Sequence, residues 1–363
     1  MKTEVYCSPQ QHSQLSQHST GRIMLWVIAA CLPGIAASTW FFGWGLLLNI
    51  LVVMVFAVLL EAVMLKLADK PVKTHLADNS ALVTGLILGI AIPPGSPWWL
   101  LFTGICFAIV VAKHLYGGLG QNPFNPAMCG YLLLLLSFPL NMTTWHLPTD
   151  TLFADQQFSP LSWTSLQYSL QLCFPALAGD GSQISEYIDG FAMATPLIEY
   201  KLAGNSTVLA ALENNSPLFA RASETGWEII NFSFLLGGLF LLFKKIIGWQ
   251  IPVSIIVTIT IMSLLFYEQG STAVYGTTYL HLFGSATMIG AFFIATDPVS
   301  AATTPGGRVV YGIFIGIAIY GIRVWGSYLD SIAIAVLFGN FCAPLLDHFC
   351  RPRIYGHSTR PSQ

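Results

Sequence analysis

Ten apolar runs, most of them close to 20 residues long, constrain this chain more than any other feature. Because the hydrocarbon core of a bilayer is about 30 Å thick, a helix of roughly 20 apolar residues can cross it. Only 9% of the residues are charged and 54% are hydrophobic, which excludes a water-soluble domain of this length. The sequence therefore predicts an all-α polytopic membrane protein with about ten transmembrane helices, near residues 23–42, 44–67, 79–95, 97–116, 126–140, 227–245, 250–268, 279–296, 306–326 and 330–349.

The third and fifth runs are short and carry Gly or Pro at their ends, so we expect broken or partly re-entrant helices there. The first twenty residues are polar, whereas a secretory signal begins with basic residues and an apolar core, so we expect the first span to be retained. The net charge of −2 gives no indication of nucleic-acid binding.

The basic residues predict the orientation, because cytoplasmic loops are enriched in Lys and Arg. With a cytoplasmic N-terminus and ten spans, only Lys201, Arg221 and Arg323 fall outside. Residues 141–226 would then form a loop on the outer side of the membrane, which for a bacterial protein is the periplasmic side of the inner membrane, and both termini would be cytoplasmic. The twelve basic residues that fall inside are Lys2, Arg22, Lys66, Lys70, Lys73, Lys113, Lys244, Lys245, Arg308, Arg351, Arg353 and Arg360.

Two halves of five spans are recognisable. The run Ala81-Leu-Val-Thr-Gly85 leads to Ala91-Ile-Pro-Pro-Gly95, and the run Ser285-Ala-Thr-Met-Ile-Gly290 leads to Ala295-Thr-Asp-Pro-Val299. Because five is an odd number, the second repeat would be inverted, and inverted repeats with broken helices often frame a ligand site near the midplane. We therefore divide the chain into a tail (1–21), a first repeat (22–140), the periplasmic loop (141–226), a second repeat (227–349) and a tail (350–363).

The seven cysteines show no spacing typical of a zinc site or an iron–sulfur cluster, and we predict no metal site. Cys173 alone lies in the long loop, so we expect no disulfide within that loop.

A Gly-, Pro- and Asn-rich segment, Gly117–Ala127, follows the fourth span at its cytoplasmic end. Its two prolines remove backbone donors, and the amides of Asn122 and Asn125 could donate and accept at the edge of a flavin or another heterocycle. An ordinary turn between two spans uses the same residue types, and composition alone favours that interpretation.

A second segment, Ala295–Ala301, is also cytoplasmic and places Asp297 before a proline at the end of an apolar helix. Its carboxylate could accept from a ligand N–H or simply cap the turn. Within the second span, Glu61 could reach the headgroups or form a proton or cation site. Arg323 could pair with Asp330 or Glu268, or contact an anionic group.

A third segment, Asp189-Gly-Phe-Ala-Met-Ala-Thr195, lies in the periplasmic loop. By propensity alone Thr195 is an unremarkable loop residue.

Taken together and in this order, Asn122-Pro-Phe-Asn125-Pro-Ala, Ala295-Thr-Asp297-Pro-Val-Ser-Ala and the Thr195 segment resemble the RnfD family, whose members are membrane subunits of Rnf (Rsx) electron transport complexes. Its sister family, NqrB, belongs to the sodium-pumping NADH:quinone reductase. The resemblance runs from about residue 22 to residue 356 and implies a complex that couples electron transfer between NAD(H) and ferredoxin-level carriers to sodium or proton movement.

The resemblance implies FMN joined through its phosphate to Thr195 by a flavin transferase, which would read Asp189, Gly190 and Ala194. The family usually has Ser or Thr three residues before the acceptor, and this chain has Ala192. A second, non-covalent flavin such as riboflavin would contact Asn122, Asn125 and Asp297. The implied partners are a periplasmic covalent-flavin subunit, iron–sulfur subunits and membrane lipid. We expect no catalytic residue in this chain itself and no complete activity from it alone.

Two other functions fit the composition. A solute channel or secondary transporter of the urea or ammonium type would have inverted repeats with broken helices and no cofactor. A scaffold subunit would bind partners and carry no flavin.

Overall fold

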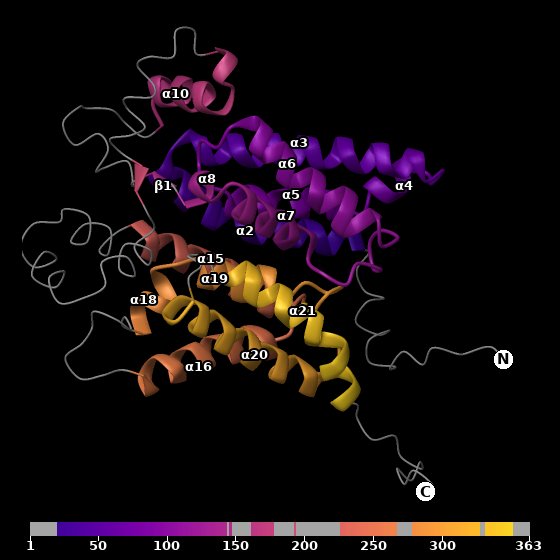
Figure 1. Cartoon of the computed structure of the whole chain (residues 1–363), viewed down its shortest axis with the longest axis vertical. Coiled ribbons are helices and arrows are strands. Elements are labelled where there is room, and N and C mark those ends of the chain that lie inside the picture. The colour runs from indigo at the N-terminus through magenta and orange to yellow at the C-terminus, as the bar shows by residue number, and fades with distance from the viewer. Residues whose placement is uncertain are drawn as a thin grey trace, which may run out of the picture.

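The computed structural model describes residues 20–143, 145–146, 161–177, 192–193, 226–266, 278–326 and 331–350. The helices of the first half lie together and those of the second half form a neighbouring layer (Figure 1). The first half contains α2 (Thr20–Phe42), α3 (Trp44–Leu67), α4 (Val72–Leu76), α5 (Ser80–Ala91), α6 (Trp98–Cys106), the π-helix η1 (Phe107–His114) and α7 (Pro126–Ser137). The second half contains α15 (Gly226–Phe243), α16 (Gln250–Leu265), α18 (Thr278–Phe283), α19 (Thr287–Ile289), the π-helix η3 (Gly290–Ile294), α20 (Pro305–Val324) and α21 (Ile332–Phe349).

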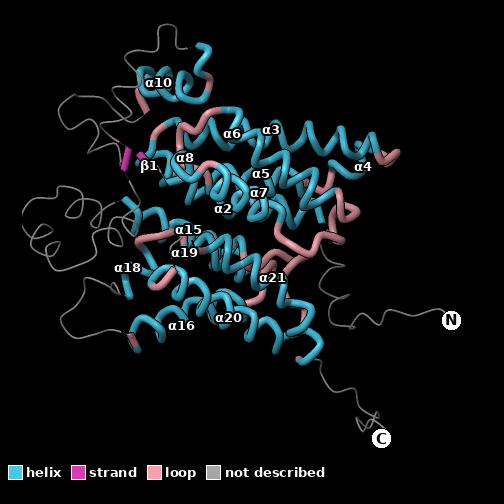
Figure 2. The backbone as a smooth tube through the Cα atoms, viewed as in Figure 1, coloured by secondary structure: helices cyan, strands magenta, loops and turns pink. Residues whose placement is uncertain are grey.

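Short elements lie between the halves in the sequence, at the end of the bundle opposite α4 (Figure 2). They are α8 (Pro139–Thr143), β1 (Trp145–His146), α10 (Trp163–Cys173), the 3-10 turn η2 (Pro175–Leu177) and β2 (Ala192–Met193). The strands pair antiparallel, with Trp145 opposite Met193 and His146 opposite Ala192. This pairing ties the start of the 141–226 segment to the stretch just before Thr195.

All ten predicted spans contain helix, which confirms the all-α polytopic prediction. Among the described residues, five helices are long and apolar enough to cross a bilayer, namely α2, α3, α15, α20 and α21. The third and fifth runs form α5 and α7, which have 12 residues each. At 1.5 Å per residue each covers about 18 Å, well short of a full crossing. The prediction of incomplete helices there is confirmed.

The predicted span 279–296 is formed by α18, α19 and η3 and is interrupted between Phe283 and Thr287, which agrees with the broken helices expected in the repeats. Side chains satisfy the backbone at this break. The Asn231 amide donates to the carbonyl of Phe283 at 2.7 Å, and the Thr287 hydroxyl donates to the carbonyl of His281. The interrupted run is the third of its half, as α5 is in the first half. The broken helices therefore occupy matching positions.

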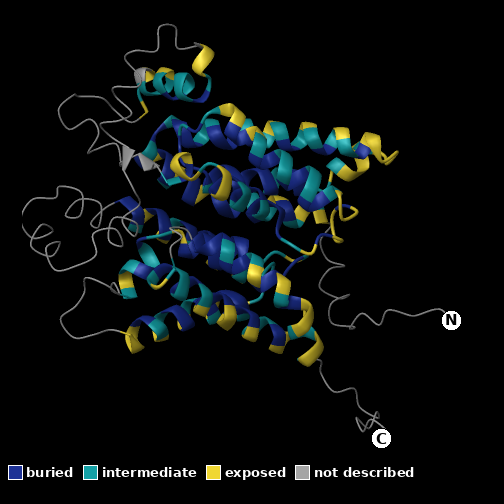
Figure 3. Cartoon of the chain, viewed as in Figure 1, coloured by how far each residue is buried: buried dark blue, intermediate teal, exposed yellow. Residues whose placement is uncertain are grey.

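One face of α3 carries an exposed apolar stripe. Leu51, Val55, Leu59 and Val63 recur every four residues, and each is more than half exposed. In water such a stripe would be costly, whereas acyl chains solvate it. Buried residues gather inside the bundle and exposed ones on its outside (Figure 3). Many of the exposed residues are large and apolar, as expected for a chain surrounded by lipid.

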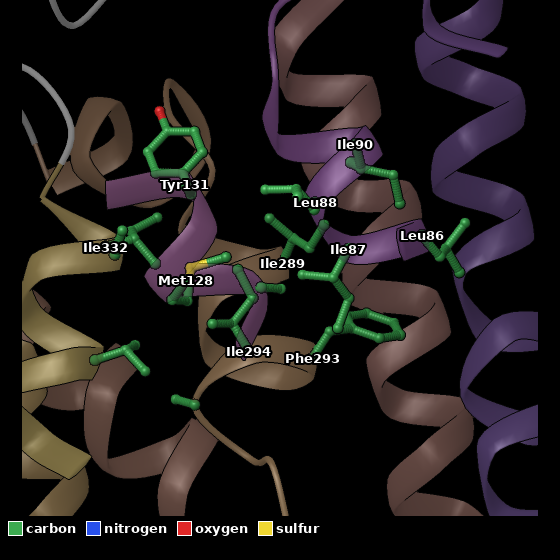
Figure 4. Packing of buried hydrophobic residues seen from close by; sticks show 14 of the residues in the cluster. Leu86, Ile87, Leu88, Ile90, Met128, Tyr131, Ile289, Phe293, Ile294 and Ile332 are labelled. Carbon is green, nitrogen blue, oxygen red and sulfur yellow. The ribbon is translucent and has the colours of Figure 1, made fainter. Parts of the chain in front are cut away.

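The two halves contact each other through helices at equivalent positions. The first helix of each half, α2 and α15, pack together, and the fifth helices, α7 and α21, also pack together. A two-fold relation between the halves predicts such like-with-like contacts. Apolar side chains from α5, α7, α19 and η3, including Leu88, Met128 and Ile289, belong to one continuous core (Figure 4). The domain boundaries given above remain predictions.

A glycine sets the approach of α2 to α15. A Cβ atom on Gly237 would overlap the backbone carbonyl oxygen of Ala30, which cannot move away without shifting α2. We expect Gly237→Ala to lower the free energy of unfolding in detergent by about 1–3 kcal/mol, the usual cost of overpacking. As a control, Gly321→Ala places its Cβ 3.8 Å from the nearest atom, on Trp325, and should be neutral or slightly stabilising. Equal stability of both variants would contradict the close packing of α2 and α15.

Candidate functional site

Asn125 links the two halves at the start of α7. Its side-chain oxygen accepts from the backbone N–H groups of Ala127 at 3.0 Å and Met128 at 3.3 Å, and Pro126 occupies the first helical position. This is an N-cap, which satisfies donors that the helix cannot pair itself. The amide nitrogen of Asn125 donates across the halves to the carbonyl of Ile294 at 3.3 Å. Both ends of this amide are therefore engaged with backbone.

Asn340 of α21 completes this contact. With its amide oriented so that both ends find partners, Asn340 accepts from the backbone N–H of Asn125 at 2.9 Å. Its nitrogen then donates to the hydroxyl of Tyr311 at 2.7 Å. Both Asn340 and Tyr311 are buried. Asn125 is thus contacted by two elements of the second half, η3 and α21, and Tyr311 of α20 in turn contacts Asn340.

The loop that contains Asp297 is stabilised by its own hydrogen bonds. The Ser300 hydroxyl donates to the Asp297 carboxylate at 2.7 Å, and the backbone N–H of Ala301 donates to the Asp297 carbonyl. Burial raises the pKa of the Asp297 carboxyl, although hydrogen bonds from Ser300 and from the backbone oppose the shift. The residue as a whole is half-buried. Its hydrogen bonds within the loop agree with the turn cap that the residue types indicated.

Asp347, near the end of α21, anchors the far side of this loop. Its carboxylate accepts from the backbone N–H and hydroxyl groups of Thr303 and Thr304, at 2.8–3.0 Å. Thr304 in turn caps α20 by accepting from the N–H of Gly307. The loop is thereby fixed at both ends.

Asn122, Asn125 and Asp297 line one cavity of about 450 Å³, called here the large cavity, although they come from both halves of the chain. Asn122 is 4% exposed; its nitrogen donates to the carbonyl of Phe124 at 3.0 Å. Its oxygen has no hydrogen-bond partner among the described residues. The full lining is Thr20, Ile23, Met24, Val27, Ser80, Val83, Thr84, Ile87, Lys113, Leu119, Gly120, Asn122, Asn125, Pro126, Ala127, Leu241, Ile246, Ile247, Phe292, Phe293, Thr296, Asp297, Pro298 and Val299.

A buried charged cluster adjoins the large cavity. The Lys113 ammonium lies 2.8 Å from Glu61 Oε1 and 2.8 Å from the Ser80 hydroxyl. His114 Nε2 lies 3.0 Å from Glu61 Oε2. Glu61 is 3% exposed and Lys113 1%. The interpretation of Glu61 as a carboxylate that reaches the headgroups is therefore wrong, because the side chain points into the bundle.

The π-helical backbone of η1 places two consecutive ionisable residues at this cluster. In an α-helix, neighbouring residues do not face the same partner. Here Lys113 and His114 approach different oxygens of one carboxylate. Single π-helical turns within α-helices occur frequently at functional sites.

Arg323 is 4% exposed and lies at the break in the second half. It donates to oxygens that surround this break and so holds α18, α20 and the start of α21 together. The predicted pairing with Asp330 or Glu268 involves residues outside those that the structure describes. The acceptors are the carbonyl of His281 at 2.7 Å and the hydroxyls of Ser285, Thr287 and Ser331 at 3.0–3.1 Å.

A second cavity, the small cavity, has about 100 Å³ and lies between the halves near the β1 end of the bundle. Thr143 is part of its wall, and β1 begins two residues later. The wall is mainly apolar and consists of Ser38, Phe42, Leu46, Ile90, Ala91, Met128, Tyr131, Leu135, Met142, Thr143, Trp227, Ile230, Asn231, Phe234, Ser285, Ala286, Ile289, Ile294, Ile332 and Ala333.

Four predicted site residues, Asp189, Gly190, Ala194 and Thr195, lie outside the described residues. Ala192 is described and lies in β2. Cys7 is not described, and the other six cysteines are free thiols.

Sequence reasoning missed the contributions of Ser80, Lys113, His114, Asn340 and Asp347. It places Lys113 only as a basic residue on the cytoplasmic side, yet the side chain is almost completely buried. Its sequence signal is a Lys-His pair at the end of an apolar run, which would also suit an interfacial anchor. Nothing local distinguishes the two roles.

Comparison with known proteins shows similarity over nearly the whole chain. The family described as NQR2, RnfD, RnfE matches residues 6–356. A protein of Aliivibrio salmonicida, named as the D-type subunit of an ion-translocating oxidoreductase complex, is 47% identical over 355 residues, which cover 96% of this chain and 97% of that protein. Proteins with the same name from Yersinia enterocolitica and Aeromonas salmonicida are each 46% identical, over 98% and 94% of this chain and 98% and 96% of their own lengths.

Proposed function

We propose that the chain serves as the D-type subunit of an ion-translocating oxidoreductase complex. The chain belongs to the NQR2, RnfD, RnfE family. The observation that carries this proposal is the identity of 46–47% to relatives of that name over almost their whole length. As a translocase subunit the chain acts with other subunits of the complex. Its membrane helices provide the translocating part, and partner subunits receive and deliver electrons.

The proposal includes FMN attached to Thr195 through a phosphoester, with Asp189, Gly190 and Ala194 read by the flavin transferase. The short sequence distances from Thr195 to β2 and from β1 to Thr143 support a position of this flavin near the small cavity. Thr195 follows β2 by two residues, and β2 pairs with β1, which begins two residues after Thr143 in the cavity wall. A step of two residues covers at most about 7 Å. A ring tethered at Thr195 therefore stays within reach of this end of the bundle.

The small cavity constrains how that ring would lie. Ligand sites that enclose a whole small molecule usually measure about 300–1,000 Å³. At about 100 Å³ the small cavity would admit the edge of a flavin rather than the complete tricyclic ring. Its apolar wall suits the methyl-substituted edge of such a ring.

A second, non-covalent flavin such as riboflavin is proposed for the large cavity. Its volume of about 450 Å³ falls within the range of small-molecule sites. The unpartnered oxygen of Asn122 is a buried acceptor that a ring N–H of the ligand would satisfy. Asn125 and Asp297 line the same cavity. Each already makes a hydrogen bond within the protein, so their main role is to hold the cavity wall in place. When bound, the flavin would supply the electron-carrying chemistry.

The remaining parts of the proposal are those that family membership implies. The partners would include a periplasmic covalent-flavin subunit and iron–sulfur subunits, and the complex would couple electron transfer between NAD(H) and ferredoxin-level carriers to sodium or proton movement. The chain would lie in the bacterial inner membrane with both termini in the cytoplasm and residues 141–226 in the periplasm. The distribution of basic residues supports this orientation.

Purification of the tagged chain from membranes of cells that express the complete complex tests the function. We expect redox subunits to copurify in fixed ratio, and the purified complex in liposomes to take up ions when reduced ferredoxin is oxidised by NAD⁺ or when NADH is oxidised by oxidised ferredoxin. The same liposomes without an electron donor are the control. A colourless chain that purifies alone and conducts urea or ammonium by itself would instead support the transporter alternative.

A further inference from the structure

Lys113 stands between the large cavity and the buried carboxylate of Glu61. Lys113 and Ser80 are part of the cavity wall, whereas Glu61 and His114 are not. The Lys113 ammonium donates hydrogen bonds to Glu61 Oε1 at 2.8 Å and to the Ser80 hydroxyl at 2.8 Å. The cluster is therefore asymmetric, because Lys113 belongs to the cavity wall and the Glu61 carboxylate does not.

This arrangement has an electrostatic consequence inside the bundle. Charges interact more strongly in a protein interior than in water, because the effective dielectric constant is lower. Because Lys113 is part of the cavity wall and Glu61 is not, we infer that a ligand in the large cavity lies closer to Lys113 than to Glu61. Asp297 is the other charged residue of the described cavity wall, and it lies on the opposite half of the chain. The Lys113 side of the cavity therefore favours negative charge on a ligand.

We propose that Lys113 is the counter-charge for a heterocyclic ligand of the large cavity that becomes negatively charged on reduction, and that Glu61 and Ser80 position its ammonium at the cavity wall. This inference rests on the proposed non-covalent flavin. Addition of two electrons and one proton to a neutral flavin leaves one negative charge on its ring. In the complex the electrons would come from a flavin or iron–sulfur carrier of a partner subunit, and the proton from water.

Riboflavin is the probe for this role, and the full chain with Thr195→Ala is the reference protein, so that no covalent flavin contributes. Equilibrium dialysis without oxygen measures its dissociation constant before and after reduction by dithionite, which supplies the electrons. We expect the reference protein to bind reduced riboflavin more tightly than oxidised riboflavin. In Lys113→Gln this preference should fall at least tenfold, with a smaller change in binding of the oxidised form.

Two further variants separate the effect of the lost charge on riboflavin binding from an effect on folding. Lys113→Gln leaves the Glu61 carboxylate buried without its ammonium, which threatens the fold. Glu61→Gln combined with Lys113→Gln removes both charges and should show the same lost preference. Glu61→Gln alone leaves the ammonium uncompensated and should increase the preference for the reduced form. Lys244→Gln is the control, because Lys244 is exposed over Trp26 and is not part of the cavity wall.

The outcomes distinguish this inference from the function on which it rests. If the reference protein binds no riboflavin in either form, the proposed second flavin fails and the role of Lys113 fails with it. If riboflavin binds but the double variant keeps the full preference for the reduced form, the second flavin stands and Lys113 is not its counter-charge. A merely structural role of Lys113 would weaken both forms equally.

Discussion

Thr195→Ala is expected to abolish covalent flavin attachment completely, because alanine has no hydroxyl to form the phosphoester. The measurement is in-gel fluorescence under ultraviolet light after denaturing electrophoresis of chain coexpressed with the flavin transferase. The parent chain should give a fluorescent band at its own mass, and the variant none. Absorption of the purified chain should show the same loss of the tightly bound flavin.

Thr207→Ala, in the same loop segment, is the matched control and should keep the full fluorescence. Ala192→Ser restores the hydroxyl residue that the family usually carries three positions before the acceptor, and should give at least as much attachment as the parent chain. A fluorescent band that persists in Thr195→Ala would place the acceptor elsewhere. A parent chain without any band in the presence of the transferase would exclude covalent attachment altogether.

Glu61→Ala is expected to cause a large loss of stability in the membrane part of the chain. Lys113 is 1% exposed, and its ammonium donates to Glu61 and Ser80. Removal of one partner of a buried ion pair costs about 3–5 kcal/mol, because the other charge stays buried without compensation. The measurement is the free energy of unfolding in a denaturing-detergent titration.

Lys66→Gln, on the same helix but exposed, is the control and should change stability by less than about 0.5 kcal/mol. The combination of Glu61→Gln with Lys113→Gln should recover much of the loss, since no unpaired charge remains. If Glu61→Ala were no more harmful than Lys66→Gln, Lys113 would have another compensating contact and the pair would not be the main stabilising feature of this site.

Much of the membrane architecture was predictable, because lipid imposes a strict rule. Each crossing helix must be apolar and long, so the runs 23–42 and 44–67 predict α2 and α3 closely. The shortness of α5 and α7 was also predictable from their flanking Gly and Pro. The position of the break between Phe283 and Thr287 was not predicted, because it depends on Asn231 from another helix.

The site was predictable only in its residue types. Local sequence indicated that Asn122, Asn125 and Asp297 could contact a heterocycle, and all three line the large cavity. It could not show that the Asn125 amide is committed to capping α7 and to the carbonyl of Ile294. That commitment involves residues 169 positions apart. Only packing of the two halves creates it.

By itself, the sequence determined that the chain is a membrane protein with ten helical segments, because hydropathy and length act locally along the chain. It also determined that the Thr195 motif lies between the two halves, because chain order is fixed, and its basic residues predict on which side of the membrane that loop lies. The tertiary structure alone decided that Lys113 is not a surface anchor but a buried charge between Glu61 and a cavity. Such a role depends on which distant helix supplies the compensating carboxylate, and no local pattern encodes that partner.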